Sequence, residues 1–262
     1  MSVPMSVSEM TEAIRCSSLS ELSWVDASGE PQARGTVALV RDEAPVLAFT
    51  YADEAVARAV AGAARLLLTV TESRSTDRGF RPVLVQGRPR LVEDASGDIF
   101  AARLLEQELR RYPPARLYAD SPLLQREHWW YLPRLIVEID VDSIEPLSAR
   151  TEPQDHLLVV AGAGGLVVRV ARLVEAADDL LTLEVSDGPA PPGRAVLFGQ
   201  DASFPDLELW AQWRYRGRWD GATFAVEESP ERTGLGRPPG LVQRWRRQRT
   251  LERRCVTAIP RP

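Results

Sequence analysis

The order of apolar and polar residues predicts that the first half of the chain is built mainly from β-strands. Runs of alternating or β-branched residues are separated by turn-forming residues such as those at 26–29 and 42–45. Because short turns of this kind join antiparallel neighbours, a meander is expected. The expected strands lie at residues 19–25, 33–40, 46–51, 65–72, 83–94 and 134–144.

Three segments are expected to be helical. Residues 52–64 place two valines one turn apart, and residues 98–112 place four apolar residues on one face. At the N-terminus, Ser6 is followed three residues later by Glu9, a pair that caps and opens a helix. In VLVQGRPRLVED at 83–94, the glycine and proline separate two β-rich arms, which are expected to form a pair of strands with a bend or bulge between them.

Part of the first half is repeated in the second. Residues 80–94 read FRPVLVQGRPRLVED, and residues 210–221 read WAQWRYRGRWDG. At one offset the aligned pairs are Phe80 with Trp210, Gly87 with Gly217, Arg88 with Arg218, Ser73 with Ser203 and Gly35 with Gly165. Expected strands at 164–173, 179–185, 194–200 and 207–217 then replace those at 35–40, 46–50, 65–70 and 80–87.

One element is missing from the second copy. Residues 186–193 read SDGPAPPG where the first half has the helical segment 52–64, and proline and glycine disfavour a helix. We interpret the pattern as an internal duplication with a degenerate second copy. The alternative is two unrelated β-rich domains that share a chance Gly-Arg pair.

Composition restricts the chemistry. The 262 residues are 44% hydrophobic and 26% charged with a net charge of -5, which is ordinary for a globular protein and argues against nucleic acid as the main partner. Neither a membrane-length apolar run nor a signal-peptide pattern occurs, so a cytoplasmic protein is expected. All 32 basic residues are arginine, which excludes lysine Schiff-base chemistry. The two cysteines and two histidines give little material for a metal site or a catalytic triad.

The predicted element order and three local motifs resemble a known family. The motifs are GEPQARGTVALV at 29–40, LAFTYADEAVARAV at 47–60 and FRPVLVQGRPRLVED at 80–94. They are similar to the flavin-site strand, the phosphate-binding turn and helix, and the long hairpin of the pyridoxamine 5'-phosphate oxidase-like flavoproteins. The resemblance covers residues 8–150 and implies a split β-barrel in that part of the chain.

The expected fold class is therefore mostly β with flanking helices (α+β), a split β-barrel followed by a degenerate barrel-like repeat. We expect a flavin-binding-like barrel at 8–150, the repeat at 155–228, and a C-terminal loop and basic helix at 229–262. In that helix Leu241 and Trp245 form an apolar edge, which favours packing on the chain's own domain or on a dimer mate.

The resemblance also places candidate flavin contacts. Arg34, Thr50 and Arg81 match residues of the family, whereas Leu39 and Val56 stand where the family has phosphate-binding lysines. Such replacements remove charge-assisted hydrogen bonds to a phosphate. The candidate cofactor-binding residues are Arg34, Thr36, Thr50, Tyr51, Arg58, Arg81, Trp129 and Arg134.

The last two candidates come from REHWWYLPR at 126–134, whose rings could stack on a flavin. In the alternative interpretation, Trp129 and Trp130 plug a barrel end with one side chain inward and one outward. His128 in the same segment is a candidate proton donor.

The resemblance implies a flavin-dependent oxidoreductase acting on a small molecule that the sequence does not identify. FMN is the first cofactor and a deazaflavin the second. Because the cofactor carries the hydride chemistry, no catalytic residue is assigned, and no metal is expected. The alternative is a family member that has lost its flavin and serves as a binding or scaffold protein, or binds haem.

The resemblance further implies a homodimer, because members of the family hold the flavin between two barrels. We expect the first-half barrels of two chains to meet, with the repeats outside. In the alternative arrangement, the repeat replaces the dimer mate within one chain, with Trp210, Trp213 and Trp219 supplying contact area.

Overall fold

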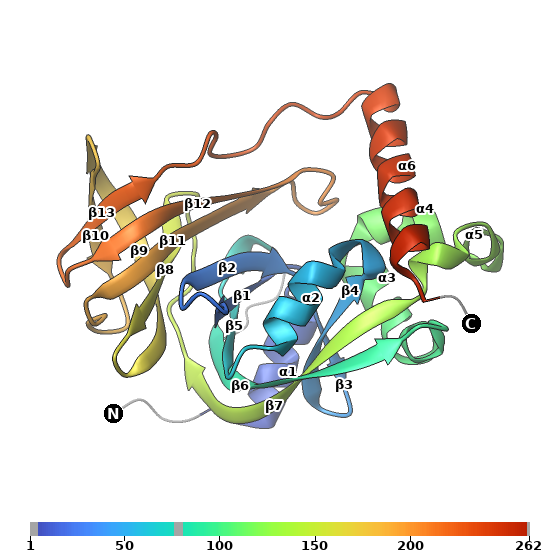
Figure 1. Ribbon diagram of the computed structural model, residues 1–262, viewed down its shortest axis with the longest axis horizontal. Helices are drawn as coiled ribbons and strands as arrows, with labels where there is room; N and C mark the ends of the chain where they lie inside the picture. The colour runs from blue at the N-terminus through green and yellow to red at the C-terminus, as the bar shows by residue number, and fades with distance from the viewer. Residues whose placement is uncertain (1–4, 76–80, 261–262) are drawn as a thin grey trace.

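The computed structural model describes residues 5–75 and 81–260. Two barrels lie side by side, and the helices α3 to α6 gather at the end of the first barrel that lies away from the second (Figure 1). The strands of the first are β1 (Ser20–Val25), β2 (Pro31–Thr36), β3 (Ala38–Arg41), β4 (Ala44–Thr50), β5 (Leu66–Val70), β6 (Val83–Asp94) and β7 (Arg134–Pro146). The fold class expected from the sequence is confirmed.

The first sheet curls until its edges meet. Its seven antiparallel strands run in the order β2-β1-β5-β6-β7-β4-β3, and the edge strands β2 and β3 are separated only by Val37. Since consecutive Cα atoms lie about 3.8 Å apart, the two edges must be close. The sequence predicted one strand across 33–40. The structure divides it because its two ends pair with different neighbours, β1 and β4.

Strand β6 is one continuous strand and not a hairpin of two arms, so this part of the expectation was wrong. Its first half pairs with β5 and its whole length with β7, which keeps both arms in one sheet. The expected bulge is confirmed, since the register shifts between Gln86 and Gly87. A Cβ on Gly87 would lie 2.5 Å from the carbonyl oxygen of Asp140, so glycine is required.

The helices agree with the sequence in part. Helix α1 (Val7–Cys16) carries the expected Ser6 and Glu9 cap, and α2 (Glu54–Ala61) lies within the expected helix 52–64. The expected helix 98–112 is confirmed over 98–111, but it contains a π-helical turn that brings the adjacent Leu104 and Leu105 into one core cluster. The other helical segments are η1 (Tyr51–Asp53), η2 (Ser73–Ser75), η3 (Phe100–Leu104), α3 (Leu105–Arg111), η4 (Pro113–Ala115), α4 (Arg116–Ala119), α5 (Pro122–Glu127), η5 (Trp129–Tyr131) and α6 (Leu241–Ala258).

Helix α6 docks by its C-terminal half. Cys255 is buried in the cluster beneath the helices, and Leu251 packs against that cluster. The apolar edge picked out in the sequence is not covered, because Leu241 and Trp245 are 84% and 58% exposed. Among the described residues, no helix has both the length and the apolar character needed to cross a bilayer.

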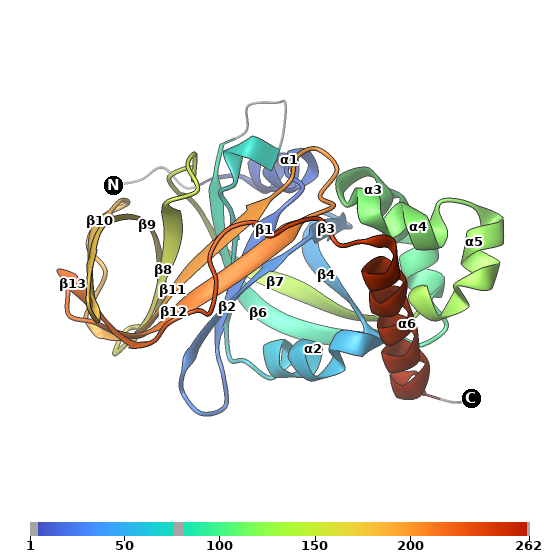
Figure 2. The ribbon, with the colours of Figure 1, turned by 90° about the horizontal axis from the view of Figure 1, so that it is seen from above.

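The second barrel is closed and repeats the strand order of the first. Its strands are β8 (Asp155–Gly162), β9 (Gly165–Ala177), β10 (Leu180–Val185), β11 (Gly193–Ala202), β12 (Trp210–Trp219) and β13 (Thr223–Glu228). Around the ring the order is β10-β13-β12-β11-β8-β9 (Figure 2). The strands of the two barrels can be matched in chain order, with β9 taking the place of both β2 and β3. Matched in this way, they follow the same spatial order in both sheets.

The bulge is repeated as well, because the pairing of β12 with β13 shifts register between Arg216 and Gly217. Residues 186–192, between β10 and β11, form no helix, as the sequence indicated. The expected strand at 207–217 begins only at Trp210, and Phe80 lies outside the described residues. These shared features support the hypothesis of an internal duplication.

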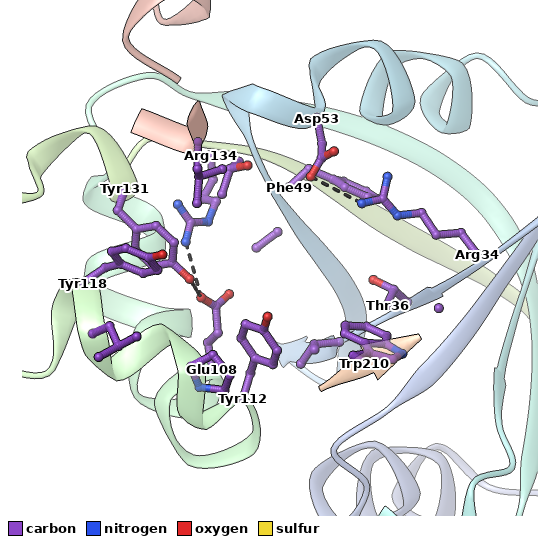
Figure 3. Close-up of a pocket in the computed structure, with 17 residues that line it drawn as sticks. Arg34, Thr36, Phe49, Asp53, Glu108, Tyr112, Tyr118, Tyr131, Arg134 and Trp210 are labelled. Carbon is purple, nitrogen blue, oxygen red and sulfur yellow. Dashed lines mark hydrogen bonds and ion pairs between the residues drawn. The ribbon is translucent and has the colours of Figure 1, made fainter. Parts of the chain in front are cut away.

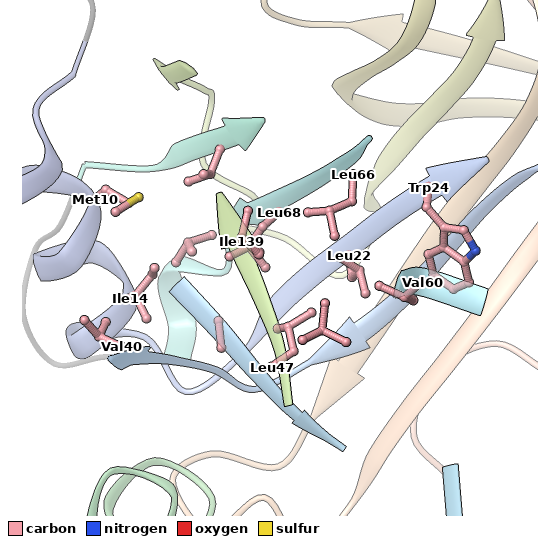
Figure 4. Packing of buried hydrophobic residues seen from close by; sticks show 14 of the residues in the cluster. Met10, Ile14, Leu22, Trp24, Val40, Leu47, Val60, Leu66, Leu68 and Ile139 are labelled. Carbon is pink, nitrogen blue, oxygen red and sulfur yellow. The ribbon is translucent and has the colours of Figure 1, made fainter. Parts of the chain in front are cut away.

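Each barrel has its own core, and a third cluster joins them. In the first barrel, Met10 and Ile14 of α1 close one end over Leu22, Leu47 and other strand residues (Figure 4). The cluster between the barrels is contributed by both, through Ala33, Leu67, Leu84, Leu147, Leu157, Val159, Val168, Val170, Val196 and Phe198. The two barrels therefore share buried apolar surface.

Candidate functional site

A pocket of about 300 Å³ lies where the first sheet, its helices and the start of β12 meet. Figure 3 shows polar and aromatic side chains arranged around a central space. The lining residues are Arg34, Gly35, Thr36, Val37, Ala48, Phe49, Thr50, Asp53, Glu108, Tyr112, Pro114, Leu117, Tyr118, Tyr131, Arg134, Trp210 and Leu251. The volume is at the lower end of the range for small-molecule sites, about 300–1,000 Å³.

One end of the pocket holds an ion pair. Alternation along β2 places Arg34 and Thr36 on the same face of that strand. Nη2 of Arg34 lies 3.3 Å from Oδ2 of Asp53, and its guanidinium carbon lies 5.9 Å from the centroid of the Phe49 ring. Both charged side chains are partly exposed, so water screens their attraction. A guanidinium has five N–H donors, so one carboxylate leaves it capacity for a ligand.

The other end is buried and rigid. Arg134 is fully buried, with its guanidinium carbon 3.8 Å from the Phe100 ring centroid and 4.2 Å from that of Tyr131. Its Nη2 lies 3.4 Å from Oε1 of Glu108, which also accepts a hydrogen bond of 2.6 Å from the Tyr131 hydroxyl. Burial raises the pKa of Tyr131 well above its ordinary value, so this phenol keeps its proton.

Aromatic rings form much of the remaining wall. Trp210 and Tyr112 meet edge to face with centroids 6.1 Å apart, and Tyr118 lies 4.8 Å from Tyr131. Burial raises the pKa of Tyr112 to about 12, so it is neutral at physiological pH. Flat rings with polar edges suit a planar ligand that also forms hydrogen bonds.

Nε of Arg134 is a buried polar atom of a lining residue that lacks a hydrogen-bond partner among the described residues. The buried hydroxyl of Thr50 has the thiol of Cys255 as its partner, and sulfur is a weak one. A buried donor or acceptor without a partner costs about 1–3 kcal/mol. A polar ligand in the pocket could recover this free energy.

Four of the eight residues predicted from the sequence line the pocket together, namely Arg34, Thr36, Thr50 and Arg134. Tyr51 follows Thr50 in the chain, but it borders a separate, more open groove beside α6. The structure thus brings the residues of β2, β4 and β7 together across the sheet.

The other three lie elsewhere. Arg58 forms surface ion pairs with two glutamates, and Arg81 forms one with Glu9. Trp129 is 52% exposed while Trp130 is buried, as the alternative interpretation with one inward and one outward tryptophan required. Arg58, Arg81 and Trp129 therefore lie at the surface and do not line the pocket.

Sequence reasoning missed several lining residues as site residues. Asp53 and Glu108 look like ordinary helix carboxylates, and Tyr112 and Tyr118 stand in a segment without a motif. Only Trp210 carried a signal, because it begins the repeated stretch. Trp210 lies 174 positions after Thr36, and a wall contributed from so far along the chain cannot be recognised by local spacing.

No family model matches the sequence, and no curated protein matches it. Among solved structures, 26 chains match. A protein of unknown function from Agrobacterium tumefaciens has 18% identity and a TM-score of 0.39, over 56% of this chain and 58% of its own. A conserved hypothetical protein from Mycobacterium tuberculosis has 18% identity and a TM-score of 0.40, over 57% of this chain and 88% of its own.

A third structure, a pyridoxamine 5'-phosphate oxidase-related, FMN-binding protein from Nostoc punctiforme, has 12% identity and a TM-score of 0.34, over 70% of this chain and 91% of its own. Others are an F420 reductase, an FMN-binding protein from Syntrophomonas wolfei and HutZ, the heme storage protein from Vibrio cholerae. At these TM-scores and identities, the chemistry of this chain must be argued from its own residues. The named neighbours are of the kind that the sequence resembles, the pyridoxamine 5'-phosphate oxidase-like split-barrel proteins.

Proposed function

We propose that the pocket binds a flavin-type ring and that the protein is a flavin-dependent oxidoreductase acting on a small molecule. The observation that carries the proposal is that Arg34, Thr36, Thr50 and Arg134, four of the candidate flavin contacts in the sequence, line one space. The aromatic wall and the unpartnered Nε of Arg134 suit the same ligand.

The residues present fit the ring better than they fit a phosphate. Tyr112 and Trp210 offer aromatic surface, and Thr36 and Thr50 offer hydroxyls for the polar edge. A bound flavin would supply hydride transfer to or from the substrate. The chain's own groups would bind and orient the ring and exclude water from it.

The phosphate of FMN has weaker support. The chain contains no lysine, and each arginine of the pocket already contacts a carboxylate, Arg34 with Asp53 and Arg134 with Glu108. A phosphate dianion placed there would meet repulsion from both carboxylates. This observation favours a second candidate function, a binding protein for a planar ligand of low charge that performs no redox chemistry.

Haem has the least support of the cofactors considered. The two histidines of the chain use both ring nitrogens in hydrogen bonds, His128 with Tyr118 and Gln248, and His156 with Gln154 and Trp213. Neither can ligate iron without losing one of these bonds. FMN and a deazaflavin therefore remain the first two candidates, in that order.

An absorbance titration of the purified protein with FMN, deazaflavin and haemin tests the proposal. We expect a shifted flavin spectrum that saturates at one equivalent. Replacing Thr50→Val removes one hydroxyl with little change of volume and should weaken binding about fivefold, since a hydrogen bond is worth about 1 kcal/mol. The matched control Thr182→Val changes an exposed threonine of β10 and should bind as the unmodified protein does.

Two outcomes would count against the proposal. If neither flavin changes its spectrum at millimolar protein, the pocket does not bind a flavin. If the flavin binds but cannot be reduced and reoxidised in place, the second candidate is supported and the oxidoreductase is rejected.

A further inference from the structure

We propose that the second barrel supplies one wall of the pocket and so completes the site within a single chain, with Trp210 as a ligand-contacting residue. Gln200 and Gln212 are the residues that position it. The ligand class rests on the proposed function, a flavin-type ring. The wall itself is defined by geometry, because Trp210 begins β12 of the second barrel whereas the polar lining residues belong to the first.

The two barrels meet through equivalent faces. In each barrel one residue pairs with the bulge glycine, Gly87 in the first and Gly217 in the second. The residue that follows this partner is Leu67 in β5 and Val196 in β11, so these two are counterparts. Both side chains lie in the cluster between the barrels. An interface that buries the same patch of both partners is the isologous contact of a twofold dimer. Here the two partners are halves of one chain.

Strand β12 approaches β2 closely at Gly35. The N–H of Gly35 donates to Oε1 of Gln212 at 3.0 Å, and Nε2 of Gln212 donates back to the Gly35 carbonyl oxygen at 3.3 Å. A Cβ at this position would collide with side chains of Gln200, Gln212 and Trp210. A side chain at position 35 would therefore displace Gln200, Gln212 or Trp210 from their present places between the two barrels.

The indole of Trp210 is held from both barrels. Its Nε1 donates to Oε1 of Gln200 at 3.0 Å, and Nε2 of Gln200 donates to Oε1 of Glu21 at 2.8 Å. Glu21 belongs to β1 of the first barrel and is fully buried. A tryptophan fixed in this way is preorganised, so a planar ligand loses little free energy in ordering it.

The equivalent position on the second barrel lacks these features. Arg34 and Arg169 correspond, because they pair with the equivalent leucines Leu22 and Leu158, and this makes Val170 the counterpart of Gly35. The aligned pair of Gly35 with Gly165 read from the sequence is thereby corrected. Val170 is 4% exposed, and its side chain fills the cluster between the barrels. One chain is therefore expected to hold one ligand.

The test uses the full chain and four variants. Trp210→Ala removes the wall, Trp210→Phe keeps an aromatic ring, and Gln212→Ala removes both hydrogen bonds to Gly35. Trp245→Ala is the control, because this tryptophan is 58% exposed on α6 and is not among the residues that line the pocket. The probes are FMN and lumiflavin, which has the ring without the phosphate tail.

This inference takes up the alternative in which the repeat replaces the dimer mate, in place of the homodimer expected from the resemblance. We therefore expect light scattering to give one chain of 29.1 kDa that binds one flavin. Trp210→Ala should weaken lumiflavin binding at least tenfold and increase the fluorescence of bound FMN, since a stacked indole quenches it. Trp210→Phe should retain most of the affinity, and Trp245→Ala should change nothing. In Gln212→Ala without ligand, the Gly35 amide should exchange its hydrogen at least tenfold faster.

A stable dimer at micromolar concentration overturns the inference, as does unchanged flavin affinity in Trp210→Ala. If the unmodified protein binds neither probe, the proposed function fails, and the inference is then decided without ligand. A monomer whose Gly35 amide loses protection in Gln212→Ala supports it, and an amide unaffected by that change overturns it.

Discussion

At the scale of single residues, His156 links stability to pH. It is 4% exposed, its Nδ1 lies 2.6 Å from the Gln154 carbonyl oxygen, and its Nε2 accepts a hydrogen bond from Trp213. Burial lowers the pKa of His156 to about 4. The unfolded chain, with an ordinary pKa of about 6.5, therefore binds a proton that the folded chain does not bind between pH 6.5 and 4.

The contribution of His156 to the free energy of unfolding should therefore be constant above pH 6.5. It should fall as the pH drops from 6.5 to 4. One pKa unit corresponds to about 1.4 kcal/mol, and pH 4.5 lies two units below the unfolded pKa, so the loss there is about 2.5 kcal/mol. Urea unfolding at pH 7.5 and 4.5 measures it. His156→Gln removes this titration, so its loss between the two values should be smaller by that amount. Equal losses in both proteins would contradict the assignment.

Charge at the pocket is also decided residue by residue. Arg34 and Arg134 would attract a phosphate if they stood alone, but each has a carboxylate within 3.4 Å. The two ion pairs respond differently to a ligand, because Arg134 is buried and Arg34 is partly exposed. Water can therefore reorganise around the Arg34 pair when a ligand arrives, whereas the Arg134 pair behaves as part of the scaffold.

At the scale of elements, the repeated glycines mark equivalent bulges in β6 and β12. A Cβ on Gly87 would lie 2.5 Å from the Asp140 carbonyl oxygen, and one on Gly217 would collide with that of Ala225. Backbone cannot yield as a flexible side chain does. The bulges thus explain why glycine is found at both positions.

Gly87→Ala and Gly217→Ala should each lower the free energy of unfolding by about 1–3 kcal/mol, the usual cost of overpacking. Gly164→Ala is the matched control, since a Cβ there meets nothing within 4 Å. Chemical denaturation of the three variants measures the difference. If Gly87→Ala and Gly217→Ala are as stable as the control, the bulges do not require glycine.

At the scale of the whole molecule, buried charges join the barrels. Arg150, in the connection between them, is 1% exposed and donates at 2.7 Å to Glu21, which also accepts from Gln200 of the second barrel. A second carboxylate, of Glu72, lies 3.5 Å from the same guanidinium. Removing the arginine leaves two buried carboxylates without this partner.

Arg150→Ala should therefore lower the free energy of unfolding by about 3–5 kcal/mol. Arg218→Ala is the control, because its side chain is 68% exposed and its loss should cost under about 0.5 kcal/mol. Denaturation followed by both far-ultraviolet circular dichroism and tryptophan fluorescence measures the effect. A change below about 1 kcal/mol would show that the network does not stabilise the contact between the barrels.

The sequence alone determined the elements and the kind of fold. Period-two apolar patterns fix which face of a strand is buried, and local caps such as Ser6 with Glu9 depend only on neighbouring residues. The strands and the Gly87 bulge were accessible for this reason, whereas the split barrel and the candidate residues that line the pocket followed from the resemblance of three motifs to a known family. The π-helical turn within the expected helix 98–112 was not, because it depends on the cluster into which Leu104 and Leu105 pack.

Only the tertiary structure decided how the pocket is closed and how its charges are balanced. Sequence spacing could not show that Trp210 packs on Gly35, or that Asp53 and Glu108 face the two arginines, since these pairs are joined by folding and not by periodicity. A strand pattern specifies burial within its own sheet. The contact between two sheets depends on side chains that meet across them, and that information is distributed over both halves of the chain.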